Sequence, residues 1–211
     1  MTWFDSFPTA KVGDFTMLVD PRDENIRKHL QDGGVWEPRG TALVEKEFTG
    51  GVFVDAGAHW GYYSLLASKK ANMVYAFEGS PYNFRYLLLN ILINKIDNVV
   101  PYPLTLWHET TTLGESFVQG NTGGSSVGKP DGPQIQAVTL DSLDLGPVDF
   151  IKVDAEGADG NILKGALKTI ATGNPKILVE SPPTEFLRGL GYRIKEDVGD
   201  GCGPLTYWRR E

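Results

Sequence analysis

The stretch Gly50-Gly-Val-Phe-Val-Asp-Ala-Gly-Ala-His-Trp-Gly61 constrains the fold more than any other part of the chain. Its apolar run, Val52–Val54, ends in the carboxylate of Asp55, and two glycines four positions apart follow, Gly57 and Gly61. Beyond them the apolar residues recur at helical spacing. A buried strand, a glycine turn and a helix N-terminus, in this order, are typical of a nucleotide-type ligand site in an α/β sheet.

The glycine turn matches neither of the two common phosphate-binding motifs. The dinucleotide fingerprint needs glycine at its first, third and sixth positions, which here hold Gly57, His59 and Tyr62. The chain has no Gly-Lys-Ser or Gly-Lys-Thr either, so a P-loop is excluded. A carboxylate at Asp55 beside backbone amides suits a ligand with a cationic group and no phosphates. S-adenosylmethionine is such a ligand.

Apolar runs of strand length alternate with segments of helical spacing along the chain. The expected strands are Val52–Asp55, Met73–Phe77, Val99–Leu104, Phe150–Val153 and Ile177–Val179, a closing pair at Tyr192–Lys195 and Leu205–Trp208, and added strands at Thr112–Val118 and Ile135–Leu140. The main expected helices cover residues 59–69, 81–94 and 159–171. This alternation predicts an α/β, Rossmann-like fold with a mainly parallel seven-stranded sheet and helices on both faces.

Length and charge bound the classes of protein. The 211 residues suffice for one domain, which we divide into an N-terminal lead-in at 1–50 and a ligand-binding domain at 51–211. In the lead-in, Asp20 is expected to cap a helix that ends at Gly33. A net charge of −7 makes a nucleic-acid partner unlikely, and the single cysteine, Cys202, excludes an internal disulfide. Without a signal pattern or an apolar run long enough for a membrane, we expect a cytoplasmic protein.

Carboxylates follow four of the expected strands, at Asp55, Glu78, Asp154 and Glu180. Ligands of open α/β sheets bind at this edge, where the strand order reverses. An acid at the end of the second strand accepts hydrogen bonds from the ribose hydroxyls of either NAD or S-adenosylmethionine, so Glu78 indicates a ribose. Any one of these acids would also serve as a helix cap. We assign the capping of the next helix to Ser80 and ligand binding to Glu78.

Asp154 and Glu156 are the candidate catalytic residues, because two carboxylates offer a base and an orienting group for deprotonating a hydroxyl or an amine. Lys152 is expected to be a buried ion-pair partner. His59 is either a general base or a group that stacks on the ligand or caps the helix. No His or Cys cluster for zinc is present, whereas Asp154 with Glu180 would offer oxygen ligands to Mg²⁺.

Residues 119–134 contain five glycines and two prolines. A loop of this length inside a domain is either a functional lid or disordered. The segment Gly123-Gly-Ser-Ser126 offers backbone amides and hydroxyls that would close over a substrate, or it is a flexible linker.

Three segments together resemble the sequence blocks of FkbM-type methyltransferases. They are Val54-Asp-Ala-Gly-Ala-His-Trp-Gly-Tyr-Tyr-Ser64, Val74-Tyr-Ala-Phe-Glu-Gly-Ser-Pro-Tyr-Asn83 and Phe150-Ile-Lys-Val-Asp-Ala-Glu-Gly157. The segment Trp36-Glu-Pro38 also resembles the family, as do Asn90, Asn94, Thr139-Leu-Asp141, Leu163-Lys-Gly-Ala166 and Ile177-Leu-Val-Glu180. The resemblance covers roughly residues 36–192. It departs from the family at Gly79, usually proline, and at Asp159, usually glutamate.

The resemblance implies a class I methyltransferase that uses S-adenosylmethionine. The residues expected to bind the cofactor are Glu37, Asp55, Gly57, His59, Gly61, Tyr63, Glu78, Gly79 and Asp154. Of these, Asp55, Gly57 and Gly61 would line its methionine part, and Glu78 would hold its ribose. The expected reaction is O-methylation of a small metabolite or glycan. The alternatives are an inactive cofactor-binding module, an RNA methyltransferase and an NAD-dependent oxidoreductase, which His59 disfavours. The sequence does not indicate the oligomeric state.

Overall fold

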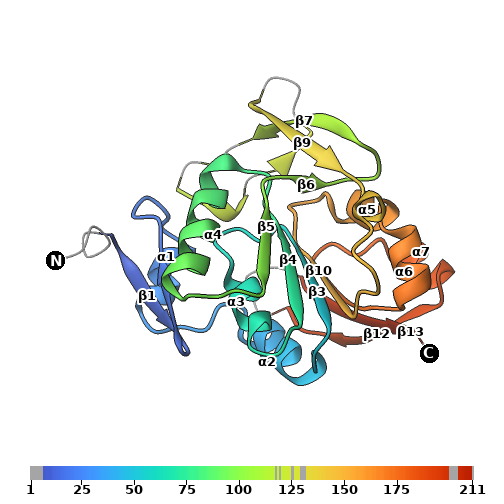
Figure 1. The fold of residues 1–211 in the computed structure, drawn as a ribbon, viewed down its shortest axis with the longest axis horizontal. Coiled ribbons are helices and arrows are strands. Elements are labelled where there is room, and N and C mark those ends of the chain that lie inside the picture. The colour runs from blue at the N-terminus through green and yellow to red at the C-terminus, as the bar shows by residue number, and fades with distance from the viewer. Residues whose placement is uncertain are drawn as a thin grey trace.

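The computed structural model describes residues 7–116, 118, 120–124, 126–128, 132–199 and 204–210. Its centre is a seven-stranded sheet in the order β12-β13-β11-β10-β3-β4-β5 (Figure 1). These strands are β3 (Val52–Ala56), β4 (Met73–Phe77), β5 (Val99–Tyr102), β10 (Phe150–Val153), β11 (Lys176–Val179), β12 (Tyr192–Asp197) and β13 (Thr206–Arg210). The pairs from β5 to β11 are parallel, and β13 is antiparallel to both of its neighbours. The expected α/β fold is confirmed, with a mixed rather than strictly parallel sheet.

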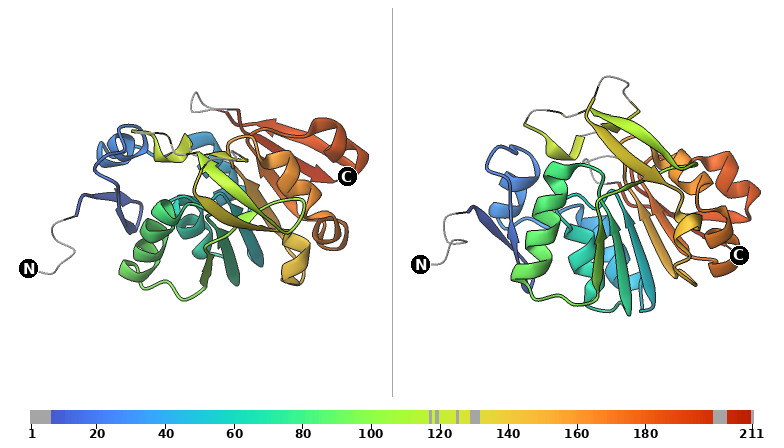
Figure 2. Two further views of the ribbon diagram at one scale, coloured as in Figure 1. Left: turned by 90° about the horizontal axis from the view of Figure 1, so that it is seen from above. Right: turned by 45° about the horizontal axis from the view of Figure 1, so that its top comes forward.

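Helices cover both faces because successive side chains of a strand point to opposite sides of the sheet. On β3, Phe53 packs into the core formed with α2 (Pro38–Glu47), α3 (Tyr62–Ser68) and α4 (Pro81–Ile93). The next residue, Val54, packs into the core formed with α5 (Asp159–Lys164), α6 (Leu167–Gly173) and α7 (Thr184–Gly189). Figure 2 shows these two helical layers on either side of the sheet.

The direction of strand addition reverses between β3 and β10. From β3 the chain builds outward through β4 to β5, then returns to place β10 on the other side of β3 and β11 beyond it. Ligands of open α/β sheets bind at such a reversal, outside the carboxyl ends of the strands. All four carboxylates predicted from the sequence lie at or just beyond these ends.

A second, four-stranded sheet is inserted between β5 and β10 in the sequence, in the order β6-β9-β7-β8. It comprises β6 (Thr105–Leu106), β7 (Thr111–Ser116), β8 (Ser126–Val127) and β9 (Gln134–Val138). The expected strands at 112–118 and 135–140 correspond to β7 and β9. Within the loop expected at 119–134, the structure has a 3-10 turn, η2 (Thr122–Gly124), and β8, whereas residues 119, 125 and 129–131 lie outside the described residues.

The N-terminal segment packs against α4. Its hairpin of β1 (Thr9–Val12) and β2 (Phe15–Leu18) is joined to α4 by Asn90, whose side chain accepts the N–H of Leu18 at 2.7 Å and donates to the carbonyl oxygens of Leu18 and Trp60. Apolar side chains of this segment also share a core with Trp60 and Leu65. A domain boundary at residue 50 stays a prediction.

Three local expectations were wrong. The first helix, α1 (Ile26–Gln31), starts later than expected, because the carboxylate of Asp20 accepts hydrogen bonds from the backbone of Arg22 and the hydroxyl of Tyr82 instead of capping it. The helix expected at 159–171 is divided, because the carbonyl of Gly165 accepts the N–H of Asp141. Helical spacing in the sequence predicts a buried face of α4 formed by Phe84, Leu87, Leu88 and Ile91, but Leu88 is 36% exposed. None of the described helices has the length and apolarity needed to cross a bilayer.

Candidate functional site

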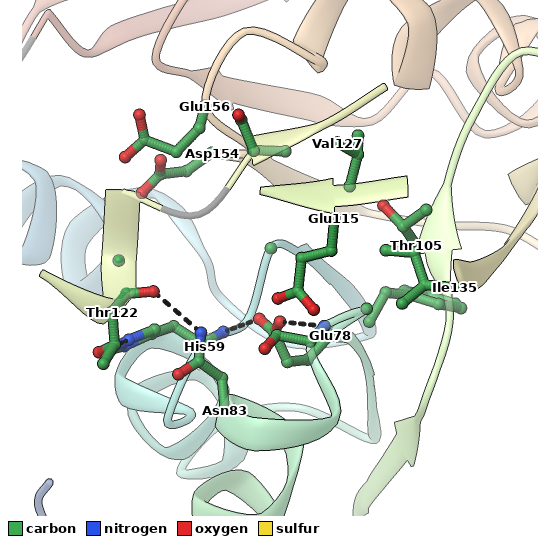
Figure 3. Close-up of a pocket in the computed structure, with 17 residues that line it drawn as sticks. His59, Glu78, Asn83, Thr105, Glu115, Thr122, Val127, Ile135, Asp154 and Glu156 are labelled. Atoms are coloured by element: carbon green, nitrogen blue, oxygen red, sulfur yellow. Dashed lines mark hydrogen bonds between the residues drawn. The ribbon is translucent and has the colours of Figure 1, made fainter. Parts of the chain in front are cut away.

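Two adjoining cavities lie at the carboxyl ends of β3, β4 and β10. The Glu78 cavity is bordered by the inserted sheet, and its lining includes Glu78, Gly79, Ser80, Asn83, Thr105, Glu115, Val127 and Ile135 (Figure 3). The Glu37 cavity lies toward the N-terminal segment, and its lining includes Met17, Ile26, Trp36, Glu37, Tyr63, Lys152 and Glu180. The two cavities share Gly57, His59, Gly123, Asp154 and Glu156. Because five residues line both, the two cavities form one candidate site.

Glu78 is held in place by backbone amides. It is 7% exposed, one carboxylate oxygen accepts the N–H of His59 at 2.7 Å, and the other accepts the N–H of Ser80 at 2.8 Å. Burial raises the pKa of Glu78 to about 7, against these two hydrogen bonds, which lower it. Because each carboxylate oxygen has two lone pairs, both retain one for a ligand in the cavity.

Ser80 was predicted to cap the helix that follows it, and this prediction was wrong. Ser80 is the residue before α4, but its side chain makes no capping hydrogen bond, and its buried hydroxyl has no partner among the described residues. The carboxylate of Glu78 binds the Ser80 amide instead. The Ser80 hydroxyl consequently stays available to the Glu78 cavity.

Gly57 brings the turns after β3 and β10 into contact. Its φ is +80°, and a Cβ at this position would lie 1.9 Å from the carbonyl oxygen of Asp154. A side chain at Gly57 would therefore displace the turn that carries Asp154, which lines both cavities. Gly61 also has a positive φ, of 91°, but it precedes α3 and does not line either cavity.

Asp55 lies below the cavity wall rather than in it. It is fully buried, and Ser64 donates a hydrogen bond to one of its oxygens at 2.6 Å. The other oxygen has no partner among the described residues, and burial raises the pKa of Asp55. Its predicted contact with the methionine part of a cofactor stays a prediction.

Lys152 has the structural role that its alternating position predicts. Its ammonium lies 2.9 Å from the carboxylate of Asp154 and 4.6 Å from the centre of the Tyr63 ring, and its side chain is 4% exposed. Burial lowers the pKa of Lys152, but Asp154, Asp55 and Glu37 together raise it above its ordinary value, so the lysine stays charged. One oxygen of Asp154 is therefore occupied by an ion pair.

Glu156 and Glu180 share the mouth of the Glu37 cavity with Asp154. Glu156 has a φ of 49°, in the left-handed region, and burial together with the charge of Asp154 raises its pKa. Burial and the charges of Asp154, Glu156 and Asp159 raise the pKa of Glu180 to about 8. A general base works best with a pKa near the working pH, which suits Glu180 to this role, whereas one oxygen of Asp154 is committed to the ion pair with Lys152. The sequence placed Glu180 at the ligand-binding edge of the sheet and as a Mg²⁺ ligand, but not as a base.

His59 is a neutral, oriented group between the two cavities. Its ring stacks on Trp60 with centroids 4.5 Å apart, and its Nε2 lies 2.8 Å from the Thr122 hydroxyl. That hydroxyl donates its proton to Asp23 at 2.9 Å, so Nε2 must carry the hydrogen and Nδ1 is an acceptor. Burial lowers the pKa of His59 to about 4. The ring stacks on a protein side chain here, and its stacking on a ligand stays a prediction.

Several residues of the site have no signal in the sequence. Asp23 and Thr122 lie 99 positions apart, and Glu115 reaches the cavity from the inserted sheet. By contrast, Glu37 and Tyr63, expected from the family resemblance, lie together in the Glu37 cavity, where the tyrosine hydroxyl donates to the carboxylate at 2.7 Å. Among the described residues, no three His, Cys, Asp or Glu side chains are grouped to hold a metal ion. A Mg²⁺ site at Asp154 and Glu180 stays a prediction.

This strand order, with an antiparallel β13 and a site at the reversal beside β3, defines a class I methyltransferase fold. The sequence model described as "Methyltransferase FkbM domain" matches residues 55–194, and the chain belongs to this family. A similar solved structure is an FkbM methyltransferase from Methylobacillus flagellatus, with a TM-score of 0.57 and 18% identity over 74% of this chain and 42% of that one. The family expectation from the sequence is confirmed.

The chain is also similar to tRNA-modifying enzymes. It is 44% identical over 52 residues to the tRNA (guanine(37)-N(1))-methyltransferase Trm5b of Pyrococcus abyssi, covering 25% of this chain and 16% of that protein. The structure of this Trm5b has a TM-score of 0.55 and 16% identity, over 97% of this chain and 56% of that one. A tRNA(Phe) (4-demethylwyosine(37)-C(7)) aminocarboxypropyltransferase of Methanocaldococcus jannaschii is 37% identical over 71 residues, which are 33% of this chain and 28% of the relative. The chain thus spans less than two thirds of each relative.

Proposed function

We propose that the protein is an S-adenosylmethionine-dependent methyltransferase that methylates a hydroxyl of a small metabolite or sugar. Family membership implies this cofactor, which supplies an electrophilic methyl group on a sulfonium when bound. The observation that carries the proposal is Glu78, a buried carboxylate whose two oxygens are oriented by backbone amides toward the cavity at the strand reversal. The residues present fit a nucleoside without phosphates, since the described lining of the Glu78 cavity contains no lysine or arginine.

Each end of the cofactor has candidate partners in this site. Glu78 would accept the ribose hydroxyls, with the base near Gly79. In the Glu37 cavity, the ammonium of Lys152 pairs with Asp154, and Glu37 adds a further carboxylate that would favour an amino group and a sulfonium. His59, which lines both cavities, is neutral and adds no positive charge that would repel a cationic ligand.

The acceptor would enter beside Glu156 and Glu180. Either carboxylate would take the proton of the acceptor hydroxyl, and the inserted sheet and the N-terminal segment would exclude water from the reacting groups. The concentration of carboxylates here disfavours a phosphate on the part of the acceptor that approaches the methyl group.

An RNA acceptor is the second candidate, and the similarity to two tRNA-modifying enzymes supports it. The net charge of −7 speaks against it, because phosphate contacts supply most of the affinity of RNA-binding proteins. A binding module without catalysis is a third candidate.

One assay with two acceptor pools separates these candidates. The purified protein is incubated with S-adenosylmethionine and either a phosphate-free extract of small metabolites and sugars or total tRNA, and release of S-adenosylhomocysteine is measured. We expect release with the metabolite pool and none with tRNA. Release with tRNA alone would favour the RNA candidate, cofactor binding without release would indicate a binding module, and no binding of the cofactor would refute the proposal.

A further inference from the structure

Glu115 reaches the Glu78 cavity from β7 and is fixed there by its backbone. Its N–H donates to the carbonyl of Pro133 at 2.8 Å, and it pairs with Val127 across the β7–β8 ladder. The residue is 7% exposed, so its side chain is more than nine-tenths buried. The inserted sheet therefore carries a carboxylate into the cavity, although a strand position of this kind is usually filled by an apolar or neutral residue.

The carboxylate of Glu115 has no described partner for its Oε1 atom. Figure 3 shows that its head group points toward Glu78 rather than away from the cavity. The charge of Glu115 contributes to the raised pKa of Glu78, as does that of Asp55 from below. Two buried carboxylates that face each other without a cation are costly unless something between them donates hydrogen bonds. A bound group with two donors, one directed at each carboxylate, would relieve this cost.

A vicinal diol meets this requirement, since its neighbouring hydroxyls donate in two directions. Glu78 approaches the gap from the end of β4 and Glu115 from the inserted sheet, and both line the same cavity. We propose that Glu115 is a second carboxylate of the nucleoside subsite and accepts a hydrogen bond from one ribose hydroxyl while Glu78 accepts one from the other. This inference rests on the proposed function and deepens it. It also predicts rejection of nucleotides that carry a phosphate on either hydroxyl, because the phosphate would meet two carboxylates.

The first test measures binding of S-adenosylhomocysteine by calorimetry to the wild type and to the Glu115→Gln, Glu115→Ala and Glu109→Gln variants. Glu109 is exposed and lies in the same inserted segment, so Glu109→Gln makes the same charge change away from the cavity. We expect Glu115→Ala to weaken binding about tenfold or more, and Glu109→Gln to stay within about twofold. Unchanged thermal midpoints would show that the Glu115 variants are folded.

The second test identifies the group that Glu115 contacts. Binding of 5′-methylthioadenosine is compared with that of its 2′-deoxy, 3′-deoxy and 6-desamino analogues, in the wild type and in Glu115→Ala. In the wild type, loss of either hydroxyl should weaken binding. In Glu115→Ala, the hydroxyl that Glu115 contacts has already lost its acceptor. Removing that hydroxyl should therefore weaken binding by less than about twofold further. If the variant is insensitive only to loss of the 6-amino group, Glu115 reads the base and the diol assignment is overturned.

The pH dependence of nucleoside binding is a further test, because it would not change if Glu115 had only a structural role. The groups that act on Glu78 are the carboxylate of Glu115 on β7, the carboxylate of Asp55 on β3, and the backbone amides of His59 and Ser80. Loss of the Glu115 charge should move the midpoint of nucleoside binding to lower pH in Glu115→Gln, and Glu109→Gln should leave it unchanged. Failure of the wild type to bind any of these compounds would remove the proposed function and this inference together. Wild-type binding that is indifferent to Glu115 would remove this inference alone.

Discussion

At the scale of single residues, the site depends on polar groups whose hydrogen-bonding directions are already set. Glu78 is oriented by two backbone amides, and His59 by a hydroxyl whose own proton is committed to Asp23. Such preorganisation lowers the cost of binding, because the side chains lose little freedom when a ligand arrives.

Replacing Glu78 by glutamine should weaken binding of S-adenosylmethionine by tenfold or more. Glutamine has a single oxygen, so one of the two amides, of His59 or Ser80, would face an NH₂ group and lose its acceptor. We expect a loss of about 1–3 kcal/mol in folding stability as well. Calorimetry and thermal unfolding measure the two effects. Binding equal to that of the wild type would contradict a role for Glu78 in holding the cofactor.

His59 should remain neutral, with its hydrogen on Nε2, throughout pH 5–8. Burial lowers its pKa to about 4, so protonation is expected only in more acidic solution. The neutral imidazole therefore contributes its full stability to folding above the unfolded pKa near 6.5. This stability is lost as the pH falls through the folded pKa of about 4. Long-range ¹H–¹⁵N NMR spectra report the tautomer. Thr122→Val should disturb it and Thr122→Ser should preserve it, because only serine keeps the hydroxyl that accepts from Nε2.

At the scale of secondary-structure elements, the central strands could be predicted because each is an apolar run bounded by turn residues. Val52–Val54 and Phe150–Val153 show this pattern, and both lie in the sheet as expected. The packing of the N-terminal segment could not be predicted, since it depends on contacts such as that of Asn90 with Leu18, 72 positions away. Glu115 was missed for the same reason: nothing local distinguishes a strand glutamate that faces a cavity from one that faces solvent.

The turn after β3 should not tolerate a side chain at Gly57. An alanine there would adopt a left-handed φ and also place its Cβ against the carbonyl of Asp154. Gly157 is a matched control in the turn after β10, because its φ is +89° but a Cβ there would meet nothing within 4 Å. We expect Gly157→Ala to cost about 1–2 kcal/mol for backbone strain alone, and Gly57→Ala to cost at least about 2 kcal/mol more. Urea unfolding measures both. Equal losses would show that the close approach of the two turns is not needed.

At the scale of the whole molecule, the carboxyl edge of the sheet concentrates negative charge in a protein that is already acidic. Asp154, Glu156, Asp159 and Glu180 surround one charged lysine, Lys152. The lysine neutralises only part of this charge, so burial and mutual repulsion raise the pKa of Asp159 to about 6 and that of Glu180 to about 8. The arrangement favours a cationic ligand at the expense of stability without one.

This cost should appear in the pH dependence of folding. A carboxyl group whose folded pKa is raised binds its proton more tightly in the native state than in the unfolded chain, where the pKa is near 4.5. The native state therefore loses stability as pH rises from about 4.5 to about 8, and the loss is complete above the folded pKa. We expect the free energy of unfolding of the ligand-free protein to be higher at pH 6 than at pH 9.

Glu180→Gln should flatten this slope, whereas Glu185→Gln, which removes an exposed charge on α7, should leave it unchanged. Saturating S-adenosylmethionine should also flatten it, because its positive charge would offset the repulsion. A wild-type slope of the opposite sign over this range would show that the carboxylates are stabilised in their charged form without a ligand.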